Sequence, residues 1–239
     1  MKIFAEALGP VLGYIFSIVG NYPLAIVLFT ILIKLLLVPL AYKQIVAMKE
    51  MQKIQPELKK LQDKYHNDKE TLNIKTMELY KEHKVNPFAS CLPLLFQMPI
   101  LLGMYEAMRQ PMTFVFNNDA IRELGQAAIS TQFLWMQNLT VPDTMYNLMQ
   151  ASEFYKTLPG ILPIIAALLT FLQSKTMSSS SQAADNPTMR TMNIMMPLMI
   201  LYFGITMSAG LTLYWVVSTL FQIGQQLVMT RLTKEVNAQ

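Results

Sequence analysis

A single charged residue interrupts the first long apolar stretch of the chain. Lys34 lies within FTILIKLLLVPL, and the surrounding apolar run from Pro23 to Tyr42 has about the 20 residues that a helix needs to span hydrocarbon. A lysine inside such a helix costs roughly 2.5–3.5 kcal/mol on insertion scales. At about 1.5 Å per residue it lies about 12 Å from the end of the run, so its ammonium group reaches the interface only in part. A cost of this size predicts a functional role for Lys34.

Few residues of the chain are of types and spacings that suggest catalysis. The expected membrane spans contain no histidine, no paired aspartates and no H-E-x-x-H motif, so we expect neither an enzyme nor a metal or cofactor. His66 and His83 lie in a charged segment, where a solvated imidazole is the ordinary role. Cys91 is the only cysteine; it cannot form an intrachain disulfide and suits a small buried apolar position.

The composition is typical of a membrane protein. Hydrophobic residues make up 53% of the 239 residues and charged residues only 14%, compared with roughly 25% charged in soluble domains. Apolar runs predict an all-α membrane protein with five transmembrane helices. The third and fourth spans are short and contain prolines, which favours a thinned bilayer or shelter by protein. The predicted spans are residues 21–42, 89–109, 157–174, 190–207 and 209–230.

Lysine distribution orients these spans. Ten lysines lie between the first two spans, whereas residues 110–156 hold only two basic residues. Because basic loops stay on the cytoplasmic side, we expect the N-terminus outside and the C-terminus inside a bacterial cytoplasmic membrane. Glycine, proline and glutamate interrupt residues 1–20, which favours an extracytoplasmic interfacial helix over a cleaved signal. The remaining segments are an extracytoplasmic loop at 110–156, a cytoplasmic loop at 175–189 and a short cytoplasmic tail at 231–239.

Residues 43–88 are expected to form a cytoplasmic helical hairpin. Apolar residues recur at helical spacing on either side of the His66-Asn67-Asp68 cluster, which suits a turn, and Pro56 suits the first turn of a helix. Ten lysines against seven acidic residues favour contact with anionic lipid headgroups. A passive, solvated loop is the alternative.

Four quoted segments carry a resemblance to a known family. LIKLLLVPLAYKQ, QPELKKLQDKY, NPFASCLPLLFQMPILLGMY and SAGLTLYWVVSTLFQIGQQ, in this order, resemble the YidC-type membrane protein insertases and their mitochondrial Oxa and chloroplast Alb relatives. The layout is similar to the compact five-span members of Gram-positive bacteria.

The resemblance implies a role for Lys34. Family members carry a positive charge at this position, inside a hydrophilic groove that is open to the cytoplasm and to lipid and receives the polar end of a client protein. Thr30 lies one turn before Lys34, where its hydroxyl is expected to help hydrate the ammonium group. Residues on other spans are expected to line the same groove, although Gln97 and Ser218 also suit helix–helix hydrogen bonding: Gln97, Gln173, Tyr214, Trp215 and Ser218.

The residue at position 34 and the tail are among the features that depart from the family pattern. Arginine is usual where Lys34 stands, and lysine keeps the charge but has no planar fork for a carboxylate. The tail is short and weakly basic, so ribosome recruitment through it is left open.

Implied partners are nascent or newly made membrane proteins and anionic lipids, with contacts to the Sec translocon or ribosome left open. No DNA is expected, and the chain is expected to act as a monomer. The alternative function is a secondary transporter or channel with a charged site near the bilayer midplane. Transporters normally contain repeated halves, and no second copy of the first-span pattern is present.

Overall fold

The computed structural model describes residues 2–86, 92–129, 132–136, 138–146, 158–177 and 187–236. In these residues the chain forms helices joined by short connections, with isolated β-bridges and no longer strand, so the predicted all-α class is confirmed. The helices are α1 Lys2–Val19, α2 Tyr22–Leu36, α3 Val38–Lys53, α4 Gln55–Lys64, α5 Lys69–Glu82, α6 Leu92–Arg109, α7 Pro111–Phe114, α8 Asp119–Ile129, α10 Ile161–Met177, α11 Pro187–Thr206 and α12 Ala209–Val236.

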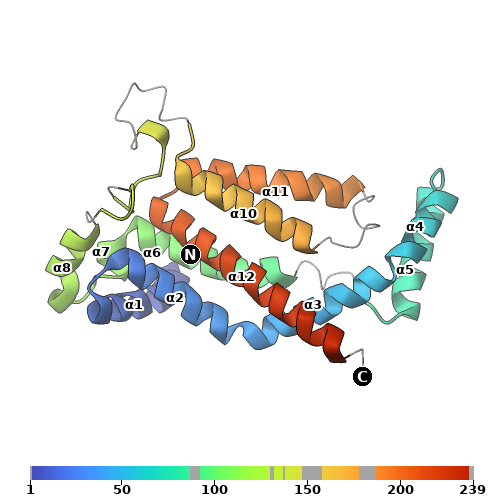
Figure 1. Ribbon diagram of the computed structural model, residues 1–239, viewed down its shortest axis with the longest axis horizontal. Helices are drawn as coiled ribbons and strands as arrows, with labels where there is room; N and C mark the ends of the chain where they lie inside the picture. The colour runs from blue at the N-terminus through green and yellow to red at the C-terminus, as the bar shows by residue number, and fades with distance from the viewer. Residues whose placement is uncertain are drawn as a thin grey trace.

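The helices form an elongated bundle with two unlike ends (Figure 1). Helices α1, α7 and α8 gather at one end, and α4 and α5 project from the other. The five predicted spans overlap α2 with the start of α3, then α6, α10, α11 and α12, which run along the bundle. Among the described residues, α1 alone is long and apolar enough to cross a membrane, and α2 with α3 passes the same test as one bent span. The apolar segments Ile161–Thr176 and Asn193–Thr206 are shorter.

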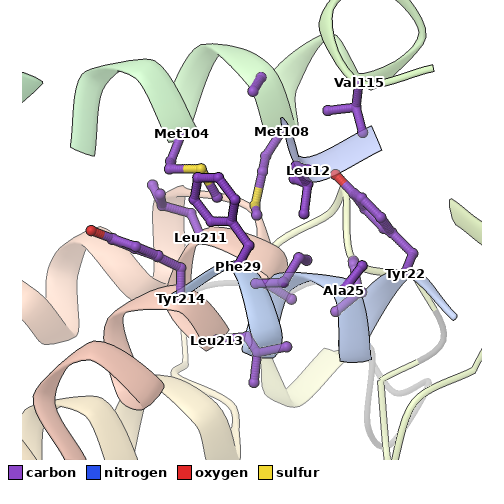
Figure 2. Packing of buried hydrophobic residues seen from close by; sticks show 14 of the residues in the cluster. Leu12, Tyr22, Ala25, Phe29, Met104, Met108, Val115, Leu211, Leu213 and Tyr214 are labelled. Atoms are coloured by element: carbon purple, nitrogen blue, oxygen red, sulfur yellow. The ribbon is translucent and has the colours of Figure 1, made fainter. Parts of the chain in front are cut away.

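Helices α1, α2, α6 and α12 share the main hydrophobic core. Figure 2 shows Phe29 of α2 in one cluster with Met104 of α6 and Leu211 of α12, and Tyr214 at the edge of the cluster. At the other edge the rings of Phe16 and Tyr22 lie near Phe116, with centroids 4.9 and 5.2 Å from it. This core fixes the positions of α2, α6 and α12 relative to one another.

Glycines allow α1 to approach its neighbours closely. A Cβ on Gly9 or Gly13 would collide with the backbone of Phe114 or Val115, and a Cβ on Gly103 of α6 would lie 2.8 Å from the Cβ of Phe4. Gly20 adopts a φ of 68°, a left-handed conformation that favours glycine at a helix end. Gly9 and Gly13 therefore serve packing between helices, whereas Gly20 serves the end of α1.

The first predicted span is bent. Helix α2 ends at Leu36, α3 begins at Val38, and their axes differ by 61°. Pro39 lies in the first turn of α3 and has no N–H to donate to the carbonyl of Leu35, so the regular helical ladder is interrupted there. Lys34 is thus in the last turn of α2, just before the bend.

The predicted hairpin consists of α4 and α5, with α3 leading into it. Pro56 lies in the first turn of α4, and Asp68 caps α5 by accepting a hydrogen bond from the Thr71 amide at 3.1 Å. Hydrogen bonding from Thr71 also holds the pKa of Asp68 below its usual value. Leu58 and Leu79 are buried, and His83 Nε2 lies 3.2 Å from Glu57 Oε2, which joins the end of α5 to the start of α4.

The segment between α8 and α10 caps two helices of the bundle. The amides of Ala209 and Gly210, at the start of α12, donate to the carbonyls of Val141 and Leu139 at 2.8 and 2.9 Å. The buried carboxylate of Asp143 accepts a hydrogen bond from the amide of Leu162 in α10 at 2.7 Å. These contacts satisfy amides that a helix N-terminus otherwise leaves without partners.

Candidate functional site: a buried lysine between α2, α6 and α12

Lys34 is buried although it carries a charge. Its residue is 5% exposed, and its place in the last turn of α2 puts a cation near carbonyl groups at a helix C-terminus, which is electrostatically favourable. Helices α6 and α12 both approach α2 through the core described above. The fold therefore brings residues far apart in sequence to the Lys34 ammonium group.

A chain of hydrogen bonds joins three helices at this point. Lys34 Nζ donates to Gln97 Oε1 of α6 at 3.1 Å, and Gln97 Nε2 donates to the Tyr214 hydroxyl of α12 at 2.8 Å. Ser218 lies one helical turn after Tyr214, and their side chains also interact by a hydrogen bond. Because both ends of the Gln97 amide are engaged, its oxygen is oriented toward the lysine.

Lys34 has no carboxylate partner among the described residues; its side-chain hydrogen bond is to the neutral Gln97 amide. An ammonium group has three donors, and Gln97 uses one of them. The remaining capacity suits an anionic oxygen, for which a charge-assisted hydrogen bond is stronger than one to a neutral amide.

Thr30 lies on the same face of α2 as Lys34 and is fully buried. Its hydroxyl donates to the carbonyl of Ile26 at 2.7 Å, so its proton is used within the helix. Only its lone pairs are available to the ammonium group or to a hydrating water.

Gln173 belongs to a second polar cluster. Its side-chain amide donates to Gln222 Oε1 of α12. One turn further along, Gln226 Nε2 donates to the carbonyl of Thr176 at 3.1 Å. This cluster, defined as Gln173, Thr176, Gln222 and Gln226, joins the end of α10 to α12. In these contacts Gln173 serves helix packing; its predicted part in the groove stays a prediction.

Trp215 is half-buried and packs against the main core. It neighbours Tyr214 in sequence, so the two side chains leave α12 in directions about 100° apart. Tyr214, not Trp215, is the residue that joins the Lys34 hydrogen-bond chain.

The described residues contain no group of three or more His, Cys, Asp or Glu side chains that could hold a metal ion. The donors and acceptors of Lys34, Gln97 and Tyr214 suit the binding of an anion or of polar groups.

Comparison with known proteins assigns the chain to a family. A family model described as "60Kd inner membrane protein" matches residues 14–236. The chain belongs to this family. The resemblance seen in the sequence is thereby confirmed, and with it the membrane protein class.

Several curated YidC-type relatives match over most of their length. The "Membrane protein insertase YidC" of Fusobacterium nucleatum is 41% identical over 208 residues, which cover 87% of this chain and 85% of the relative. That of Caldanaerobacter subterraneus is 36% identical over 234 residues, covering 98% and 97%. The "Membrane protein insertase MisCA" of Bacillus subtilis is 39% identical over 229 residues, covering 94% and 76%.

A solved structure confirms the fold. The crystal structure of an active YidC insertase with its first transmembrane domain resolved matches with a TM-score of 0.64 at 22% identity, covering 93% of this chain and 45% of that one. The YidC fold is therefore present across nearly the whole chain.

Sequence reasoning missed several polar residues that make contacts within this YidC-type bundle: the buried Asp143 and the half-buried Gln222 and Gln226. Asp143 also accepts from the Trp135 indole N–H at 3.2 Å, a contact within the segment between α8 and α10. The four-residue spacing of Gln222 and Gln226 indicates one helix face, a signal that was available in the sequence. Nothing local pointed to Asp143, because its partners lie 8 and 19 residues away.

Proposed function

We propose that the chain is a membrane protein insertase in which Lys34 receives the polar or acidic segment of a client protein. Family membership supports the general activity, because the relatives are named membrane protein insertases. The observation that carries the specific role is the buried ammonium group of Lys34, which has only a neutral amide as its side-chain partner among the described residues.

Client binding would proceed by exchange at the ammonium group. A client carboxylate would take the unused donors of Lys34 or replace the Gln97 oxygen at 3.1 Å. The binding free energy gained is the difference between a charge-assisted ion pair and a hydrogen bond from the ammonium group to a neutral amide. It is largest where water is scarce. Tyr214 would keep Gln97 in place during this exchange through its hydrogen bond to Nε2.

The client's apolar helix would meanwhile move into lipid beside the bundle. Burial of about 20 apolar residues supplies most of the driving force, and the membrane potential assists the transfer of acidic residues to the outer side. This scheme needs no nucleotide at the site.

We also propose a topology with the N-terminus outside and the C-terminus inside the cytoplasmic membrane, based on the lysine-rich segment between the first two spans. The α4–α5 hairpin would then lie in the cytoplasm near anionic headgroups. Action as a monomer, and contacts with the Sec translocon or ribosome, stay predictions.

Reconstitution into liposomes tests the role of Lys34. Two single-span clients would be compared, identical except that acidic residues of the translocated segment are replaced by their amides, and insertion would be scored by protease protection. Lys34→Arg should retain insertion of the acidic client, whereas Lys34→Ala and Lys34→Glu should impair it.

The amide client is the matched control, because its insertion should depend less on the charge at residue 34. Undiminished insertion of the acidic client by Lys34→Glu would contradict the proposed role. Solute movement in the same vesicles without client insertion would favour a transporter instead.

A further inference from the structure

Gln225 of α12 has a buried side-chain donor without a hydrogen-bond partner among the described residues. Its Nε2 atom is shielded from solvent and unpaired, although the side chains of its neighbours Gln222 and Gln226 are both bonded to α10. A buried unpaired donor costs about 1–3 kcal/mol. Helix packing alone therefore does not explain an amide at this position.

Gln225 lies on the same face of α12 as the Lys34 hydrogen-bond chain. It follows Tyr214 by 11 residues. At about 100° per residue this is three full turns of the helix, which leaves the two side chains only about 20° apart around the helix axis. Ser218 falls between them on this face. At about 1.5 Å per residue, Gln225 lies about 16 Å further toward the C-terminal end of α12.

Helix α12 lies beside α2, which carries Lys34, and beside α3, which follows it beyond the bend (Figure 1). Tyr214 is on the side of α12 that faces α2 and α6, because it bonds Gln97. By helical phase, Gln225 lies about 20° from Tyr214, compared with about 60° from Gln222 and about 100° from Gln226, so it is nearer to the side of Tyr214 than to that of the Gln173, Thr176, Gln222 and Gln226 cluster.

We infer that Gln225 is a second client contact: once the client displaces the groups that shield Nε2, the side-chain amide binds a backbone carbonyl of the client's polar segment on its way to Lys34. The inference rests on the proposed function. A neutral donor suits a peptide carbonyl, a group that every client carries and that needs a partner once it leaves water. An extended chain covers about 3.3 Å per residue, so about five client residues would separate this carbonyl from the acidic residue at Lys34.

Photocrosslinking tests the contact directly. A photoreactive phenylalanine analogue would replace Gln225 in the full-length protein, with Leu227, which is 51% exposed and about 200° away on the helix, as the control position. The client would be held with its acidic residue at Lys34. Crosslinks from position 225 should map about five residues from that acidic residue and exceed those from position 227 several-fold.

Substitution separates client binding from a structural role. Gln225→Leu keeps a similar volume and should slow insertion by about 2- to 10-fold, the equivalent of one neutral hydrogen bond. It should leave the thermal midpoint in detergent unchanged or higher, because a buried unpaired donor is removed. Gln222→Leu is the control and should lower that midpoint, because it leaves Gln173 without its partner.

Three results would overturn this inference: crosslinks to lipid instead of client, insertion at the wild-type rate by Gln225→Leu, or a midpoint loss equal to that of Gln222→Leu. Lys34→Glu would be measured in parallel. If Lys34→Glu impairs acidic clients and Gln225→Leu does not slow insertion, only the second contact fails. If neither variant has an effect, the proposed function fails with it.

Discussion

Gln97→Glu places a carboxylate beside the Lys34 ammonium group without changing the number of heavy atoms. At the 3.1 Å that separates Lys34 Nζ from Gln97 Oε1, two opposite unit charges attract by about 5 kcal/mol at an effective dielectric constant of 20. Desolvation offsets most of this attraction, and we take a net gain of about 1–2 kcal/mol over the amide. The Tyr214 hydroxyl can rotate and donate to the new carboxylate, so the contact between α6 and α12 is kept.

An internal carboxylate would compete with the client's carboxylate for Lys34. A net gain of about 1–2 kcal/mol corresponds to roughly a 5- to 30-fold loss of apparent affinity for an acidic segment. The assay is the liposome insertion measurement with the acidic client and its amide-substituted control at subsaturating concentration. Gln97→Glu should slow the acidic client selectively and leave the abundance and thermal midpoint of the protein near wild type.

Two results would refute this reasoning. Equal slowing of the acidic and amide clients would indicate damage to the bundle and not competition for the charge. Wild-type insertion of the acidic client would show that Lys34 does not receive carboxylates. Gln97→Leu is a useful companion, because it removes the acceptor from Lys34 without adding a charge and should destabilise the bundle.

Two further predictions concern the positions of the helices. Asp143→Ala should lower the free energy of unfolding by about 2–4 kcal/mol, because the buried Leu162 amide and the Trp135 indole lose their acceptor. Asp119→Ala, at an exposed position of α8, is the control. Equal thermal midpoints for the two variants would contradict the capping role of Asp143. Gly103→Val should cost about 1–3 kcal/mol by pushing α1 from α6. Gly224→Ala, where nothing lies within 4 Å of a new Cβ, should not destabilise, and similar midpoints for the two glycine variants would argue against close packing of α1.

The sequence by itself was sufficient for the features that depend on composition and local pattern. Low charge content, long apolar runs and helical periodicity determined the all-α membrane class, because a chain in hydrocarbon must satisfy its backbone within helices. Pro56 and the Asp68 turn predicted where helices of the hairpin begin, since proline and a capping carboxylate act within one turn. The cost of burying Lys34 was also visible locally, and so was the family resemblance carried by the quoted segments.

Tertiary structure decided which residues meet. Gln97 lies 63 positions from Lys34, and Tyr214 lies 117 positions from Gln97, so no local period could pair them. Gln173 is predicted to line the same groove as Lys34, and this stays a prediction; its hydrogen bond to Gln222 joins residues 49 positions apart, so only the packing of α10 against α12 pairs them. Gly9 and Gly13 interrupted the apolar run of the N-terminal segment in sequence, and only the approach of α7 explains them. Whether a segment forms a helix depends on residues close to one another in sequence. The face that each helix turns toward its neighbours depends on the shapes of the surfaces that pack together.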